Sequence, residues 1–133
     1  MSARLSPGAL SGLPGDVARP RYDRAALRTG IVHLGVGAFH RAHQAVYCDD
    51  ALGAGDARWG ITAASLRSPE TRDALVPQGG LYTLAVRGAD GEALRVIGAV
   101  RDVLVAPEDP GALIGAMSAP DVKIVSLTVT AKG

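Results

Sequence analysis

Two glycines that follow a short apolar run constrain this chain more than any other feature. Residues 31–34 read Ile-Val-His-Leu, Gly35 and Gly37 come directly after them, and a helix-forming segment begins near Phe39. A buried strand, a glycine turn and a helix start, in this order, present backbone N–H groups to the pyrophosphate of a dinucleotide. The pattern therefore predicts a strand–turn–helix unit of the kind that opens a nucleotide-binding domain.

The segment after the glycines predicts one helix over residues 39–52. Its small or apolar residues recur at a spacing that puts them on one helical face, which suits close packing against a sheet. These residues are Ala42, Ala45, Cys48 and Leu52. Arg41, Gln44 and Asp49 fall mostly off that face.

Strand and helix signals alternate through the rest of the chain. Residues 59–66 predict a second strand, and Ser68-Pro69-Glu70 predicts a helix start with Ser68 as its cap. Residues 81–87 and 92–105 predict two strands joined through an Asp-Gly turn, which is a hairpin signal.

The last third of the chain continues this alternation. Asp109-Pro110 opens a helix that Pro120 closes. Residues 122–130 form the last predicted strand, apolar on both faces as a central parallel strand would be.

The order of elements indicates an α/β fold, a partial Rossmann-type dinucleotide-binding fold with parallel strands and an inserted β-hairpin. We expect residues 1–21 to form an N-terminal surface arm and residues 22–133 to form the first part of the domain. A complete fold of this type has two halves and about six strands. The chain therefore matches a Rossmann domain truncated after its first half.

Composition narrows the range of partners. The chain has 133 residues, which is enough for one domain. Its net charge of +1 creates no strong electrostatic field that would attract nucleic acid or an anionic membrane. Cys48 is the only cysteine, which excludes an internal disulfide. The chain has neither the apolar run of a signal peptide nor one long enough to span a bilayer, so we expect a cytoplasmic location.

The glycine pair alone is weak evidence for a cofactor, because a strand-to-helix turn also needs unusual backbone angles. The third glycine of the dinucleotide fingerprint is replaced here by His40, and Ala42 compensates for it in part. His40 and His43 lie three residues apart, but a metal site needs three or four ligands. We expect both to pack or hydrogen-bond against neighbouring strands, His33 to be a satisfied core histidine, and Cys48 to be buried.

Four segments resemble one enzyme family, in order along the chain. Residues 30–44 read GIVHLGVGAFHRAHQ, residues 20–24 read PRYDR, residues 65–68 read SLRS, and residues 124–130 read IVSLTVT. Together they resemble the polyol-specific long-chain dehydrogenases, a family that includes mannitol 2-dehydrogenase and fructuronate reductase. The Phe-His-Arg-Ala-His run is far more specific than the glycines.

The resemblance implies NAD(P)-dependent, metal-independent oxidation of a secondary alcohol on a small-molecule polyol or sugar acid. The family's cofactor turn falls on five consecutive residues, Gly35, Val36, Gly37, Ala38 and Phe39. Arg41 either adds positive charge near the pyrophosphate or is a surface cation. Arg67 and Glu70 follow the second strand, where an acid favours NAD and an arginine favours NADP. The family favours NAD, and NADP stays open.

The resemblance places no catalytic residue in this chain. The family's lysine base, with its asparagine and histidine partners, lies in a C-terminal helical domain, and Ala131 stands where related sequences carry a glutamate. We therefore expect the 133-residue chain to be inactive by itself. The alternative is a non-catalytic, truncated module that binds a nucleotide or docks on a partner.

Overall fold

The computed structural model describes residues 4–131, in which ten strands and helices follow one another. In chain order they are β1 (Thr29–Leu34), α1 (Ala38–Ala42), α2 (Gln44–Gly53), β2 (Gly60–Ser65), α3 (Glu70–Leu75), β3 (Tyr82–Gly88), β4 (Gly91–Ile97), β5 (Val100–Val105), α4 (Pro110–Met117) and β6 (Ile124–Leu127). Short 3₁₀ turns lie at Pro7–Gly12, Arg24–Ala26, Ala57–Trp59 and Val76–Gln78.

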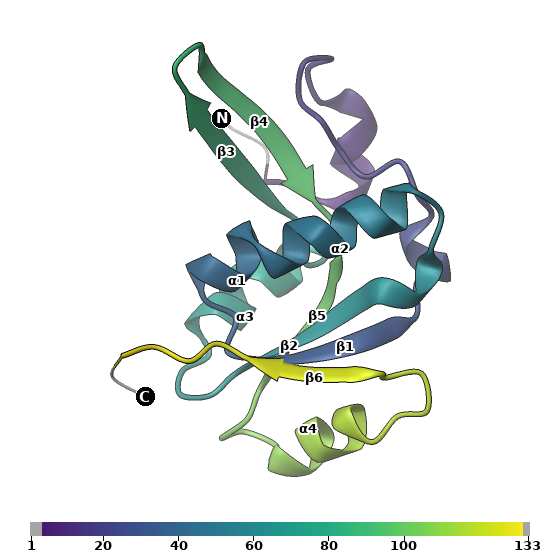
Figure 1. Cartoon of the computed structure of the whole chain (residues 1–133), viewed down its shortest axis with the longest axis vertical. Helices are drawn as coiled ribbons and strands as arrows, with labels where there is room; N and C mark the ends of the chain where they lie inside the picture. Colours follow the sequence, from purple (N-terminus) through teal and green to yellow (C-terminus); the bar gives the residue numbers. More distant parts are fainter. Residues whose placement is uncertain (1–3, 132–133) are drawn as a thin grey trace.

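Four strands form a parallel sheet in the order β5-β2-β1-β6 (Figure 1). From β1 the chain steps outward in one direction to β2 and β5, then returns to the other side for β6. Helices α1 and α2 cover one face of this sheet, and α4 covers the other (Figure 1). This is the arrangement of the first half of a doubly wound fold, and it confirms the predicted α/β class with its inserted hairpin.

Alternation along the strands divides the core into two layers. On the face towards α2, Ile31, Ile61 and Val100 pack against the buried helix residues Ala45 and Leu52. The opposite face has a smaller apolar cluster, in which Val32 and Ala64 pack against Leu113 of α4. Because both faces are covered, every residue of β2 is buried.

Strands β3 and β4 pair antiparallel from Tyr82↔Ile97 to Gly88↔Gly91, as the Asp-Gly turn predicts. This hairpin projects from the parallel sheet, and the N-terminal arm lies beside it (Figure 1). Val17 of the arm is buried against Leu81 and Val96, and Ala18 bridges Arg95. The arm thus packs directly against the hairpin and covers part of it.

The prediction of one strand over residues 92–105 is wrong. β4 ends at Ile97, and β5 begins at Val100 in the other sheet. A Cβ at Gly98 would lie 2.5 Å from Pro20 Cγ and 2.9 Å from the Tyr22 hydroxyl, so only glycine fits between the strands. The Gly98 N–H donates to Asp49 Oδ1, and its carbonyl accepts from Arg24 Nε, so side chains replace its strand partners.

The predicted helix over residues 39–52 is divided in two at His43, whose φ of −125° and ψ of −85° are not helical. The His43 N–H donates to the His40 carbonyl, while its ring Nδ1 lies 2.8 Å from the Phe39 carbonyl oxygen. The imidazole thus takes the acceptor that the backbone N–H of a continuous helix would use. Figure 1 shows α1 and α2 following one another along the same face of the sheet.

Two further expectations differ from the structure. Helix α3 begins at Glu70 with Pro69 as its N-cap, and no side-chain hydrogen bond from Ser68 caps it. Strand β6 is shorter than residues 122–130 and lies at the edge of the sheet. Its apolar side chains are exposed because, within residues 4–131, β1 is its only neighbour. None of the helices in that range is long and apolar enough to cross a membrane.

Candidate functional site

The two glycines of the turn between β1 and α1 have different roles in its structure. Gly35 has a φ of +98°, which favours glycine, and its N–H donates to the Ala64 carbonyl of β2 at 2.7 Å. Val36 is buried, and Gly37 caps the start of α1 with an ordinary φ of −74°. The turn therefore fixes the position of α1 above the carboxyl ends of β1 and β2.

A cavity of about 280 Å³ opens on this turn, and we call it the Gly37 cavity. It is lined by Gly35, Val36, Gly37, Ser65, Leu66, Arg67, Ser68 and Thr71. Nothing lies within 4 Å of the place that a Cβ on Gly37 would occupy. The cavity thus reaches the bare backbone of the turn, as close approach of a ligand requires.

The structure brings Arg67 into this cavity but not Glu70. Glu70 is the first residue of α3, and its exposed side chain lies outside the lining. Ser68 and Thr71 add two hydroxyl groups beside Arg67. The polar rim of the cavity therefore consists of one cation and two hydroxyls.

The other predicted cofactor residues lie on α1. Arg41 bends back towards the turn, with its Nε 3.4 Å from the Gly37 carbonyl oxygen and its Cζ 6.0 Å from the centre of the Tyr82 ring. It does not line the Gly37 cavity. Ala38 begins the helix, and the 63% exposed ring of Phe39 lines a different cavity.

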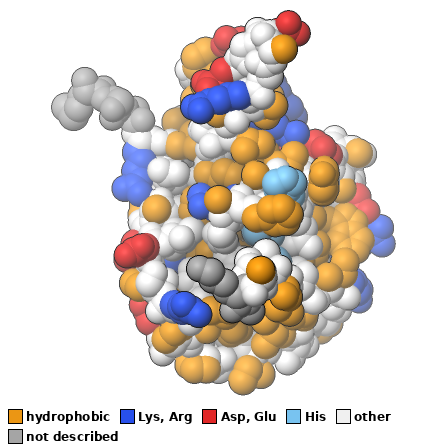
Figure 2. All heavy atoms as spheres, turned by 60° about the vertical axis from the view of Figure 1, so that its left-hand side comes forward, with side chains coloured by type: hydrophobic (Ala, Val, Ile, Leu, Met, Phe, Trp, Pro, Cys, Tyr) orange, Lys and Arg blue, Asp and Glu red, His pale blue; other side chains and the backbone are white. Residues whose placement is uncertain are grey.

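That second cavity, which we call the His40 cavity, has a volume of about 290 Å³ between the ends of β1 and β6. Its lining is His33, Phe39, His40, Gln44, Ser126, Leu127, Thr128 and Val129. Figure 2, which turns the carboxyl ends of the strands forward, shows histidine side chains set among hydrophobic ones on this face. The two cavities flank β1, where the strand order reverses and ligands of open α/β sheets bind.

His33 is fully hydrogen-bonded, as predicted for a core histidine. Its Nδ1 lies 2.7 Å from Ser126 Oγ, and its Nε2 lies 3.1 Å from Thr128 Oγ1. Because Ser126 Oγ donates to Gln44 Oε1, it accepts from Nδ1, so we assign the proton of the neutral ring to Nδ1. Burial lowers the pKa of His33, which keeps the ring neutral.

His40 differs from its neighbour. Its ring stacks on that of His33 with the centroids 3.8 Å apart, but neither of its nitrogens has a hydrogen-bond partner among the described residues. Burial and, less strongly, the nearby His33 lower the pKa of His40, and the Gln44 side chain raises it in part, so that it falls to about 4. The prediction that His40 packs or hydrogen-bonds against a neighbouring strand is confirmed by its stack on His33 of β1.

The prediction that His43 packs or hydrogen-bonds against a neighbouring strand is wrong, because its exposed ring stacks on Phe39 of α1 and its Nδ1 bonds the Phe39 carbonyl oxygen. Within residues 4–131, no group of three or more histidine, cysteine, aspartate or glutamate side chains is placed to hold a metal ion. Cys48 is buried as predicted, and burial raises the pKa of its thiol to about 11, so it is not a reactive thiolate.

Sequence analysis missed a cluster around Asp49, which it placed off the buried face of the helix. Asp49 is 5% exposed, and it accepts hydrogen bonds from the Tyr22 hydroxyl, the Gly98 N–H and Arg95 Nη2. The signal was the PRYDR segment at residues 20–24, which contains Tyr22. The cluster joins this segment to α2 and β4.

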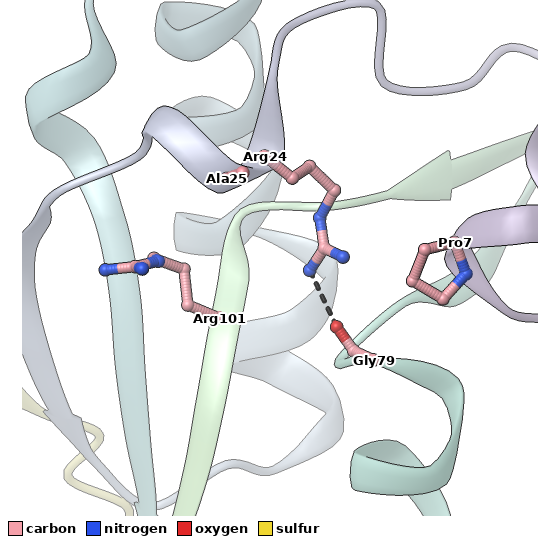
Figure 3. Close-up of a pocket in the computed structure, with 5 residues that line it drawn as sticks. All are labelled: Pro7, Arg24, Ala25, Gly79 and Arg101. Atoms are coloured by element: carbon pink, nitrogen blue, oxygen red, sulfur yellow. Dashed lines mark hydrogen bonds between the residues drawn. The ribbon is translucent and has the colours of Figure 1, made fainter.

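Arg24, in the same segment, has a related role. Its guanidinium donates to the carbonyl oxygens of Gly79 and Gly98, at 2.8 and 3.0 Å. Figure 3 shows Arg24 pointing towards Gly79 across a hollow that Pro7 and Arg101 also line. Because Arg101 lies at the start of β5, this hollow is at the opposite end of the sheet from the two candidate cavities.

Comparison with known proteins gives a consistent result. Residues 29–133 match the family model of the mannitol dehydrogenase Rossmann domain. Mannitol 2-dehydrogenase of Pyrenophora tritici-repentis is 45% identical over 98% of this chain and 23% of its own length. D-mannonate oxidoreductase of Escherichia coli is 45% identical over 92% of this chain and 26% of its own.

Solved structures give the same picture. Pseudomonas fluorescens mannitol 2-dehydrogenase, in a ternary complex with NAD and D-mannitol, has a TM-score of 0.88 and 42% identity, covering 93% of this chain and 26% of that one. A substrate-free D-sorbitol dehydrogenase has a TM-score of 0.89 and 35% identity, covering 97% and 28%. The chain thus spans about a quarter of the length of these relatives.

Proposed function

The chain belongs to the family of mannitol dehydrogenase Rossmann domains, and from this premise we propose that it is the N-terminal, cofactor-binding part of an NAD(P)-dependent oxidoreductase. The substrate we propose is the secondary alcohol of a polyol or sugar acid, of the mannitol/fructose or mannonate/fructuronate type. The names of the relatives, which include mannitol 2-dehydrogenases and a D-mannonate oxidoreductase, support this substrate class.

The observation that carries the proposal is the bare backbone at Gly37. Its φ of −74° and ψ of 176° suit any residue, and no atom lies within 4 Å of a Cβ built there. The fold itself therefore does not require glycine at this position. A ligand that approaches the backbone closely does require it, and a pyrophosphate at the turn is such a ligand.

The residues of the two cavities fit the two halves of a dinucleotide. We assign the pyrophosphate to the backbone of Gly35, Val36, Gly37, Ala38 and Phe39. The adenosine half then falls in the Gly37 cavity, beside Arg67. Glu70 and Arg41 require side-chain rotation to reach it, since neither lines the cavity. We propose NAD as the cofactor because a relative of known structure binds it, with NADP as the alternative that Arg67 favours.

The chain's part in the reaction is binding and orientation. When bound, the nicotinamide supplies the site that accepts or returns a hydride. We assign no catalytic role to any residue of this chain, and propose that residues 22–133 act with a catalytic domain like the one that the longer relatives have room for.

The test compares Gly37→Ala with Gly88→Ala. Gly88, at the tip of the hairpin, also has open space around it, but it does not line the Gly37 cavity. We expect Gly37→Ala to weaken NAD binding at least tenfold in isothermal titration calorimetry, while the urea midpoint stays equal or rises slightly. Gly88→Ala should bind NAD as the wild type does. Wild-type chain that binds neither NAD nor NADP would refute the proposal.

A further inference from the structure

His40 is the one buried side chain in residues 4–131 whose nitrogens lack a hydrogen-bond partner. The residue is 1% exposed, so water does not replace the missing bonds freely. Folded proteins satisfy nearly all buried polar groups, because an unsatisfied one is costly. The position therefore needs an explanation other than packing.

The neighbours of His40 are already committed to other bonds. His33, stacked on it, uses both ring nitrogens with Ser126 and Thr128. The Gln44 side-chain oxygen accepts from Ser126 Oγ at 3.3 Å. His33, Ser126 and Thr128 thus pair with one another and leave His40 without a hydrogen bond to any of them.

The lining of the His40 cavity is of mixed character. Phe39, Leu127 and Val129 are its apolar residues and are 63%, 58% and 74% exposed. His33, Gln44 and Thr128 contribute polar groups to the same lining. A flat ring that carries one hydrogen-bonding substituent matches such a cavity, since apolar walls hold the ring and convergent polar groups orient the substituent.

We propose that His40 binds the carboxamide of the nicotinamide ring when the dinucleotide occupies both cavities, an inference that rests on the proposed function. A neutral imidazole has one donor and one acceptor, and a carboxamide offers the complementary pair. The ring must turn about its Cβ–Cγ bond to expose a nitrogen to the ligand. This rotation replaces the parallel stack on His33 and costs no hydrogen bond to the described residues, since His40 makes none with them.

The first experiment follows the histidine ring nitrogens by ¹⁵N NMR in the wild-type 133-residue chain. Nicotinamide mononucleotide and NAD should shift the His40 ring signals, and AMP should not. If AMP and NAD bind but no nicotinamide compound moves His40, or if AMP shifts it equally, this inference fails while the proposed function stands. If no nucleotide binds at all, both fail.

The second experiment uses His40→Phe, which keeps the stacked ring and removes both nitrogens. We expect binding of NAD to weaken about tenfold, the loss of one good hydrogen bond, and binding of AMP to stay unchanged. The urea midpoint at neutral pH should not fall, because no hydrogen bond is lost. Unchanged NAD affinity in a folded variant would overturn the inference, and the NMR experiment decides if the variant does not fold.

His43→Phe is the matched control. It makes the same change three residues away, on an exposed ring outside the cavity whose Nδ1 bonds the Phe39 carbonyl. This variant should lose stability and keep its NAD affinity, the reverse of the pattern expected at position 40. A purely structural role for His40 predicts the same loss of stability in both variants.

Discussion

His33 and His40 show how two residues of one type acquire different properties from their surroundings. His33 lies in β1 and His40 in α1, both are buried, and their rings lie nearly parallel, at an angle of 7°. His33 meets two hydroxyl groups at the end of β6, whereas His40 faces its neighbour and the cavity. The difference depends on β6, some 90 residues further along the chain, so the local pattern around Gly35 does not contain it.

The low pKa of His40 predicts a specific loss of stability in acid. Its folded pKa is about 4, whereas a histidine in an unfolded chain has a pKa near 6.5. Between these values the unfolded chain binds a proton that the folded chain does not, so the free energy of unfolding falls as the pH falls through this window. We expect His40 to contribute roughly 2 to 3 kcal/mol to that decrease.

Urea denaturation of the wild type and His40→Phe between pH 7 and pH 4 measures this contribution. Carboxylates and His33 titrate in both proteins, so the difference between the two curves reports on the His40 imidazole. The curves should diverge progressively below pH 6.5, with the wild type losing more stability. Parallel curves would contradict a depressed pKa at this position.

At the scale of elements, the sequence correctly predicts those strands, turns and helices whose signals lie within a few consecutive residues. The first strand, the hairpin turn and the helix opened by Asp109-Pro110 lie where their patterns place them, and the Asp109 side chain does cap α4. Gly35, Gly37 and Arg67 meet in one cavity for the same reason, since parallel strands end at one edge. The family resemblance is confirmed over most of the chain.

The breaks between elements were not predictable in this way. Residues 92–105 have the composition of one strand, and their division at Gly98 depends on Pro20 and Tyr22 from a distant segment. The helix break at His43 depends on an imidazole that competes for the Phe39 carbonyl. In both cases a side-chain contact overrides a favourable local pattern.

Asp49 of α2 binds Tyr22, Arg95 of β4 and the Gly98 N–H, and its removal should be costly. We expect Asp49→Ala to lower the free energy of unfolding by about 3 kcal/mol, because Arg95 and the Gly98 N–H lose a buried partner. Asp50→Ala is the control, since the Asp50 side chain is 60% exposed and bonds the same Arg95. Its effect should stay within about 0.5 kcal/mol in urea titrations. Equal effects in the two variants would contradict a special role for Asp49.

At the scale of the whole molecule, the parallel sheet is complete at one side only. Its order, β5-β2-β1-β6, corresponds to the first four positions of a doubly wound sheet, which continues with two more strands beyond the fourth. Within residues 4–131 no strand pairs with the outer edge of β6. The pattern of residues 122–130 is that of a central strand, and the exposure of β6 is therefore consistent with a strand that has a second neighbour in longer relatives.

An open edge with apolar side chains should make the 133-residue chain associate. Ile124, Val125 and Leu127 are 43%, 47% and 58% exposed, and unpaired edges of this kind recruit other strands. In sedimentation velocity we expect the average mass to rise above 13.6 kDa with concentration. Val125→Lys, which places a charge on the edge, should restore the monomer.

Val76→Lys provides the matched control, since Val76 is 46% exposed but lies in a 3₁₀ turn away from any strand edge. It should associate as the wild type does, because its hydrophobic exposure is equal but it offers no backbone for pairing. If the residues that follow in the longer relatives add the next strand of a doubly wound sheet, a chain extended by them should stay monomeric at this edge without any substitution. Wild-type chain that remains a monomer at all concentrations would show that exposure of β6 alone does not drive pairing.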